Sequence, residues 1–563
     1  MKKNREIIQA ILLYVITTAL ITYPVIFYLN SKIFAQAGDP YSSIFNFWQY
    51  ASQTSKINYF FPEHSLYRFY SNILSRLTNE VFTYNFIIFF ACIFSALSFY
   101  FIVKHLTKNH WIGLIGGLIA ILLPYRFAQS LQHLNLANIG FLGFFIYFLL
   151  KSRQKANYKN VILAGIFFTL TTLDSYIYGL FAGIILIIYL AIIFIIKLAK
   201  KEIILYQKSI LPILTSCAIV CVIVGYFTYP FWSDIIGNNQ SVAPKSLPKR
   251  SLHEIEVYSS YAGYYFLPSP DNPLFGKFTE KYFDEKVNSL GTNRTEQINY
   301  LGYTLIFLAI VYLIYFFKNY KHIGKDRKFA TYLFLTIGLI GFYLSFSYRI
   351  YLFGTYINPL PEKISEIVLF FRVYSRLSLL ASIGLIFTAC LGLEIMANNI
   401  KHSHHKYFFF AMVLLLLLVE FLIIPKDTIQ QVDYQSMPQV YKEIDVSDCY
   451  IIEYPLIHKD SPNGYIYLLW NRLNGCKLFN REYKFIENGE EIRKSIRNIN
   501  EDNILDIKNL GISHIIIHKD KFLNDNIMGA QDDYLKRDIP NLLQIPKLEK
   551  IGEWENKELY SIR

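Results

Sequence analysis

The chain has 563 residues, of which 53% are hydrophobic and only 17% are charged. A soluble globular protein carries about 25% charged residues, so this composition excludes that class and favours a membrane protein. The 47 Phe and 45 Tyr residues are typical of spans bordered by aromatic belts. The formal net charge of +13 does not indicate nucleic-acid binding, because the basic residues lie in short connectors between apolar runs and form no single patch.

Eleven apolar runs fit, or nearly fit, the roughly 17–25 residues that a helix needs to cross a bilayer. The first follows Lys2, Lys3 and Arg5 and is longer than the apolar region of a signal peptide, so we expect it to remain as an uncleaved span. The sequence therefore predicts a mainly α-helical polytopic membrane protein whose membrane module covers residues 1–424. The expected spans are 7–29, 82–103, 111–123, 134–150, 161–176, 178–196, 209–229, 301–317, 329–347, 376–396 and 407–424.

The connectors between these runs alternate in their content of Lys and Arg. The positive-inside rule assigns the basic connectors, and with them the N-terminus, to the cytoplasm. We expect the protein to lie in the plasma membrane with the other connectors on the outer side. These outer segments are 30–81, 124–133, 230–300, 348–375 and everything after 425.

A single acid, Asp39, follows the first expected span, between Gly38 and Pro40. The next residues have helical apolar spacing, with Ile44 and Phe47 on one face, so we expect an amphipathic helix that lies along the membrane surface. Asp before Pro is also an ordinary helix start, because Asp caps helices and Pro is favoured at the first helical position. Asp39 is therefore either a cap or a catalytic carboxylate.

Other ionisable residues gather at the expected outer ends of the spans. Taken singly, each has a structural explanation, because outer arginines snorkel to lipid headgroups and an interfacial His or Asp can cap a helix. Taken together, an acid, a histidine and three arginines on one membrane face are suited to binding a phosphate-bearing ligand. The candidates are Arg126, His133, Asp174, Arg372 and Arg376.

The region 425–563 has alternating strand-like and helix-like runs, which predict a small α/β domain outside the membrane. It contains no Gly-rich phosphate loop and no nucleophile elbow, so we assign it no chemistry of its own.

Two weaker signals lie in the outer segments. Asn293-Arg294-Thr295 matches a glycosylation sequon, a pattern of low specificity. Cys449 and Cys476 are the two cysteines of the outer domain, where an oxidising compartment permits a bridge. Buried thiols are the alternative, and the sequence leaves both open.

Several short motifs along the chain resemble the GT-C superfamily of membrane glycosyltransferases, and more narrowly a bacterial and archaeal family of large GT-C-like proteins. They are G-D-P at 38–40, P-Y-R-F-A-Q-S-L-Q-H-L-N at 124–135, P-S-P-D-N-P-L-F-G at 268–276, F-R-V-Y-S-R at 371–376 and L-G-I-S-H-I-I-I-H at 510–518. The resemblance implies a polyprenyl-phosphate sugar donor and an acid in the first outer loop, whose place Asp39 takes. Many members carry two adjacent acids there and this chain has one, so we expect no cofactor, with a divalent metal left open.

The expected function is transfer of a sugar from a polyprenyl-phosphate donor to an acceptor on the outer membrane face. Asp39 would be the general base, the arginines would hold the lipid phosphate, and His133 would orient either. The expected partners are the lipid-linked donor, membrane lipids and an acceptor that the sequence does not name, but no nucleic acid. Two alternatives remain: a transporter or flippase of lipid-linked sugars, whose ionisable residues would gather near the bilayer midplane, and a non-catalytic envelope-assembly protein.

Overall fold

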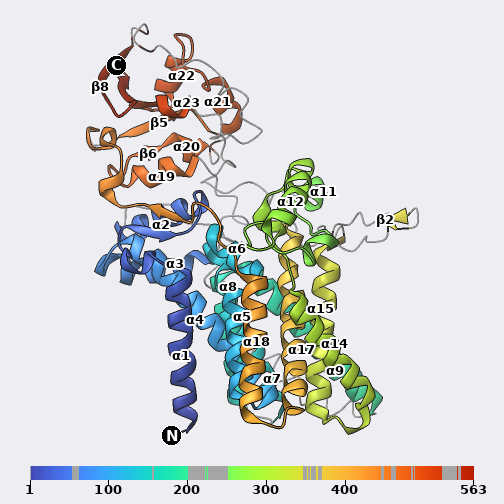
Figure 1. Cartoon of the computed structure of the whole chain (residues 1–563). Coiled ribbons are helices and arrows are strands. Elements are labelled where there is room, and N and C mark those ends of the chain that lie inside the picture. Colours follow the sequence, from blue (N-terminus) through green and yellow to red (C-terminus); the bar gives the residue numbers. More distant parts are fainter. Residues whose placement is uncertain are drawn as a thin grey trace.

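The computed structural model has two parts, a bundle of long helices and a smaller α/β domain (Figure 1). The described residues are 2–52, 63–154, 158–200, 252–346, 371–444, 449–457, 464–483, 488–522 and 547–562, with isolated residues and pairs in the gaps. The expected span 209–229 lies outside the described stretches.

Ten of the eleven expected spans are helices in the structure. Their ends follow local signals: the Asn79 side chain caps α4 by accepting the Phe82 N–H, and α1 ends early because Pro24 interrupts its run. The helices are α1 (Lys2–Ile21), α4 (Glu80–Thr107), α5 (His110–Leu122), α7 (Gly140–Gln154), α8 (Tyr158–Asp174), α9 (Tyr176–Ala199), α14 (Tyr303–Lys318), α15 (Lys325–Ser345), α17 (Ser378–Asn398) and α18 (Ser403–Phe421).

Seven of the described helical segments are long and apolar enough to cross a membrane, and eight if the bent pair α5 and α6 (Pro124–Gln132) counts as one span. That pair is bent by 41°, because Pro124 has no N–H with which to continue the hydrogen-bond ladder of α5. The predicted fold class, a helical polytopic membrane protein with a C-terminal α/β domain, is confirmed. The predicted count of about eleven spans exceeds what the described helices give, partly because α14 has only 16 residues.

The helices pack around an apolar core, and α15 and α17 approach each other closely at two glycines. A Cβ atom added to Gly384 would lie 2.4 Å from the carbonyl oxygen of Phe334 and 2.5 Å from Cα of Gly338. A larger residue would push the two helices apart, because protein interiors are close-packed. The segments that connect these helices at one end of the bundle are the expected outer segments.

The expected outer segments meet at the end of the bundle opposite the N-terminus (Figure 1). There, β1 (Lys32–Phe34) pairs with β4 (Ile429–Gln431) in an antiparallel ladder. The other elements at this end include α2 (Asp39–Ser52), α3 (Glu63–Leu77), α6, α11 (Leu252–Val257) and α12 (Gly276–Leu290). The short helix α13 (Arg294–Gln297) packs on α6 and α12. The described outer segments thus share one end, and that this end faces away from the cytoplasm stays a prediction.

The apolar face of helix α2 packs against protein, whereas the sequence predicts that it faces the membrane surface. Its apolar side chains Ile44 and Phe47 are buried among α3, α4 and α19 (Tyr465–Asn471) of the C-terminal domain. Trp48 of α2 also lies against Gly475. An apolar stripe shows only that a helix face needs covering, and here protein covers it.

The C-terminal domain is built on a five-stranded sheet in the order β6-β5-β7-β9-β8. The first three strands of that order are parallel, and β9 joins β7 and β8 in antiparallel pairs. The strands are β5 (Tyr450–Tyr454), β6 (Lys477–Leu478), β7 (His514–His518), β8 (Leu548–Trp554) and β9 (Lys557–Ile562). A disulfide joins Cys449 to Cys476 with a Cα–Cα distance of 5.0 Å, which decides the alternative that the sequence left open.

Candidate active site

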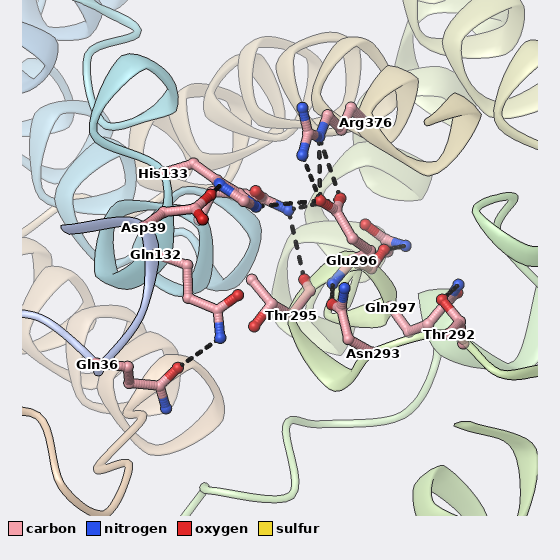
Figure 2. A network of polar contacts seen from close by, with 12 residues as sticks. Gln36, Asp39, Gln132, His133, Thr292, Asn293, Thr295, Glu296, Gln297 and Arg376 are labelled. Atoms are coloured by element: carbon pink, nitrogen blue, oxygen red, sulfur yellow. Dashed lines mark hydrogen bonds and ion pairs between the residues drawn. The ribbon is translucent and has the colours of Figure 1, made fainter. Parts of the chain in front are cut away.

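Asp39 lies at the start of α2, where the chain turns out of the first outer loop. The turn needs the glycine before it, because Gly38 has a φ of 128° that side-chain-bearing residues rarely adopt. The loop is fastened to α6, since Gln132 donates to the Gln36 side chain at 2.9 Å. The Asp39 side chain is 46% exposed, and its Oδ2 accepts a hydrogen bond from His133 Nδ1 at 3.0 Å (Figure 2). Within the described residues no backbone N–H donates to this carboxylate, so it is not acting as a cap.

His133 lies between two carboxylates. It follows the last residue of α6, and its backbone N–H is held by the carbonyl of Gln129. Its Nδ1 faces Asp39, and its Nε2 lies 3.4 Å from Glu296 Oε1. Only 20% of the His133 side chain is exposed. The imidazole therefore links a solvent-accessible acid to a buried one.

Glu296 is the residue that the sequence did not single out. It lies in the four-residue helix α13, which Asn293 caps by accepting the Glu296 N–H at 2.9 Å, so the predicted sequon serves as a helix start. The Glu296 side chain is 2% exposed and binds both Nε and Nη2 of Arg376. Gln129 donates to its other oxygen, Oε2, at 2.9 Å. The only sequence signal was the cap spacing from Asn293 to Glu296, which predicts a helix start but not a partner.

We call Asp39, His133, Glu296 and Arg376 the outer chain. Burial alone would lower the pKa of His133, but its hydrogen bonds to Asp39 and Glu296 outweigh burial and raise that pKa above its ordinary value. Burial would raise the pKa of Glu296, but the Arg376 guanidinium and His133 hold it well below its usual range. The four side chains of the outer chain thus alternate between a carboxylate and a nitrogen base, from the exposed Asp39 to Arg376.

Comparison with known proteins places the chain in a family. A family model described as "Domain of unknown function (DUF6311)" matches residues 66–421. The chain belongs to the DUF6311 family. No curated protein matches it.

Two solved structures align with this DUF6311 chain at 12% sequence identity, each over 92% of this chain and 70% of the other. Both are of the Archaeoglobus fulgidus oligosaccharyltransferase. The apo form gives a TM-score of 0.49, and the complex with an inhibitory peptide and a dolichol-phosphate gives 0.40.

Arg126 of the DUF6311 chain does not join the outer chain. Its side chain is fully buried and donates to the carbonyl oxygens of Ala137 and Ile121 at 2.9 and 3.0 Å, and to Cys92 Sγ at 2.8 Å. The expected anion site shared by three arginines therefore does not form here. The helix α6 ends at Gln132 and the chain turns before His133, so Arg126 and His133 do not share a helix face.

The other two candidates lie at the margins of the site. Arg372 is 40% exposed, donates to Glu254 Oε1 at 3.2 Å and lies over the Tyr258 ring at 5.2 Å. Asp174 is the last residue of α8 and is buried. Burial raises the pKa of Tyr70 on α3, and the negative charge of Asp174 nearby adds to that shift. Of the six residues predicted from sequence, the structure thus brings three, Asp39, His133 and Arg376, into one network.

Most of the atoms of the outer chain that could bind a divalent cation have partners within the protein. Both oxygens of Glu296 are occupied by Arg376 and Gln129, and both ring nitrogens of His133 face carboxylates. A guanidinium on the same carboxylate would repel a metal ion. Among the described residues no group of three or more His, Cys, Asp or Glu side chains is placed to hold a metal.

A second carboxylate–histidine pair lies inside the C-terminal domain. Glu453 and His518 are fully buried on the neighbouring strands β5 and β7, with Glu453 Oε2 2.7 Å from His518 Nε2. The Tyr441 hydroxyl donates to the same oxygen. Lys521 and Lys557 complete this inner cluster, with Nζ atoms 4.9 and 5.7 Å from the centre of the Trp470 ring. Burial raises the pKa of Glu453 to about 8 and lowers that of His518 well below its ordinary value.

Proposed function

We propose that this protein is a glycosyltransferase that moves a sugar from a polyprenyl-phosphate donor to an acceptor hydroxyl at the outer membrane face. The observation that carries the proposal is the half-exposed carboxylate of Asp39, held by a histidine that a buried Glu–Arg pair supports. An exposed base backed by positioned charges is the arrangement expected for proton abstraction. The motif resemblance to GT-C enzymes supports the same class.

In the proposed reaction the acceptor hydroxyl binds beside Asp39 on its solvent side. Asp39 takes the hydroxyl proton while the acceptor oxygen forms a bond to the anomeric carbon of the sugar. The bond from that carbon to the phosphate oxygen breaks, and the lipid phosphate leaves with the electron pair. His133 fixes one carboxylate oxygen of Asp39, so the other remains directed to the acceptor.

The remaining charged residues have separate roles in this proposal. Glu296 and Arg376 are positioning residues, because they act on Asp39 only through His133. Arg372 is the candidate for the donor phosphate, since its guanidinium is partly exposed and makes a single ion pair among the described residues. A transporter is disfavoured, because these ionisable groups lie at one end of the bundle and transporters place theirs near the bilayer midplane.

The substitution Asp39→Asn tests the proposal with little change in shape. Purified protein in liposomes is incubated with a panel of polyprenyl-phosphate sugars and an acceptor mixture, and release of lipid phosphate is measured. Asn has no usable proton affinity, so turnover should fall on the order of a hundredfold or more while thermal stability is kept. Asp506→Asn, at an exposed position of the C-terminal domain, is the matched control and should keep the parental rate. Equal turnover of Asp39→Asn and parent would remove Asp39 as the base.

A further inference from the structure

Helix α3 buries hydroxyl-bearing side chains and exposes a row of apolar side chains. Its buried face carries Ser71 and Ser75, whose side chains are 0% and 9% exposed. Ser71 Oγ donates to the carbonyl oxygen of Phe47 at 2.6 Å, and Ser75 Oγ lies 2.7 Å from Thr83 Oγ1. Tyr67, on the same face, is buried and packs its ring on Phe47, so the inward face of α3 is held by hydrogen bonds and by aromatic packing.

The outward face of α3 carries an apolar stripe. Phe69, Ile73 and Leu77 are spaced four residues apart, so they lie along one side of the helix. They are 58%, 43% and 77% exposed. Scattered apolar residues are normal on a surface, but three in register on one helix face form an apolar patch of the kind that meets lipid or protein.

The stripe lies beside the surface that the membrane module presents to lipid. α3 and α1 both pack on α4, and α3 runs into α4 through the cap residue Asn79, which also binds the carbonyl of Asn30 after α1. The exposed face of α1 is apolar at Leu12, Ile16 and Leu20, which are 56%, 57% and 71% exposed. Figure 1 shows α3 beside the end of α1 that is farther from the N-terminus.

We infer that α3 lies in the membrane interface of the leaflet at the C-terminal-domain end of the bundle, with its stripe among acyl chains. Arg68 and Arg76 are exposed on the same helix, and their guanidinium groups suit the phosphates of lipid headgroups. The lipid-facing helix at this end is thus α3, whereas α2 is covered by protein. Since Ser71 binds the backbone of α2, α3 holds the helix that begins at Asp39 at a fixed depth.

The test measures lipid contact and does not depend on enzymatic activity. Phe69→Trp and Leu77→Trp are each placed in nanodiscs made either with ordinary phospholipids or with phospholipids brominated on the acyl chains. Ile551→Trp is the matched control, because Ile551 is 45% exposed on β8 at the far end of the C-terminal domain. The emission of the parent is subtracted to remove its own tryptophans.

Bromine should reduce the added emission of Phe69→Trp and Leu77→Trp at least twofold and leave that of Ile551→Trp unchanged. Quenching at 69 and 77 no stronger than at 551, with quenching by aqueous iodide instead, would overturn the inference. Shielding from both quenchers would also overturn it and would indicate a protein partner or a second copy on the stripe. Ile73→Trp repeats the measurement if one of the other variants fails to fold.

Discussion

The outer chain and the inner cluster each place a carboxylate against a histidine, but they differ in what surrounds the pair. His133 lies between two carboxylates, and the buried one, Glu296, is bound to Arg376. His518 has one carboxylate partner, Glu453, and both are completely buried near two lysines. Burial favours the neutral form in both places. In the inner cluster burial determines the direction of both pKa shifts. In the outer chain the hydrogen bonds of His133 to two carboxylates and the Arg376 guanidinium beside Glu296 outweigh burial.

The pKa values of His133 and Glu296 set the pH range in which the outer chain is most stable. His133 has a raised pKa, so its stabilising effect is complete below about pH 6.5, the ordinary value, and is lost as pH rises through its folded pKa. Glu296 has a lowered pKa, so its effect is complete above about pH 4.3 and is lost as pH falls through its folded pKa. The outer chain is therefore most stable between these limits.

The largest effect is expected for Glu296→Gln, compared with the same change at Glu453. Removing the charge of Glu296 leaves Arg376, which is 12% exposed, without its buried counter-ion. Breaking such a pair costs about 3–5 kcal/mol of unfolding free energy. Glu453→Gln at pH 7 replaces a neutral carboxyl and should cost much less. Thermal unfolding in one detergent compares the two, and equal losses would remove the distinction between the regions.

Arg126→Lys tests whether the outer chain extends further into the bundle. The lysine keeps the charge but cannot reach the three acceptors of the planar guanidinium. We expect a loss of about 1–3 kcal/mol in unfolding free energy from unsatisfied buried groups. Turnover per folded molecule should stay at the parental level, because Arg126 does not contact the outer chain. A drop in turnover without a loss of stability would show that Arg126 takes part in the reaction.

The pH dependence of the inner cluster should disappear in Glu453→Gln. In the folded protein Glu453 keeps its proton up to about pH 8 and His518 is neutral. In the unfolded chain the histidine loses its proton at about pH 6.5. Between these values the folded state binds more protons, so stability falls as pH rises, by roughly 1–2 kcal/mol. Hydrogen exchange of the β5 and β7 amides at pH 6.5 and 8 measures this fall. A slope in the variant equal to that of the parent would contradict it.

The smallest effect is expected for Arg372→Lys at the edge of the outer chain. Its ion pair with Glu254 is partly exposed on both sides, and such pairs contribute about 0–1 kcal/mol. Stability should therefore hardly change. The KM for the lipid-linked donor should rise if the guanidinium binds the donor phosphate with two hydrogen bonds. An unchanged KM would leave Arg372 as a surface residue.

The parts of the fold that depend on long hydrophobic patterns could be predicted from the sequence. The apolar runs predicted ten of the described helices, and alternating strand and helix signals predicted the α/β domain. Asp39 and His133 could be named because each stands out in an apolar chain, although they are 94 residues apart. Their contact itself had no sequence signal.

Other features could not be predicted because they depend on short elements or on packing. Glu296 lies in a four-residue helix, which is too short to show a hydrophobic period. Arg126 was grouped with the other outer arginines because it lies in an expected outer segment, and the sequence does not show that its side chain is buried against backbone carbonyl oxygens. The apolar stripe of α2 was predicted correctly. A hydrophobic pattern does not show whether lipid or protein covers the stripe, and here α19 covers it.

The ladder between β1 and β4 has a consequence for biosynthesis. Tyr41, two residues after Asp39, donates to Gln430, which is 389 residues further along the chain. At the roughly 5–20 residues per second of protein synthesis, that distance corresponds to about 20–80 s. During this time the first outer loop has been made but its partner strand has not, so its backbone must be protected by water, lipid or a chaperone. The site around Asp39 is therefore completed only after the last membrane helix has left the ribosome.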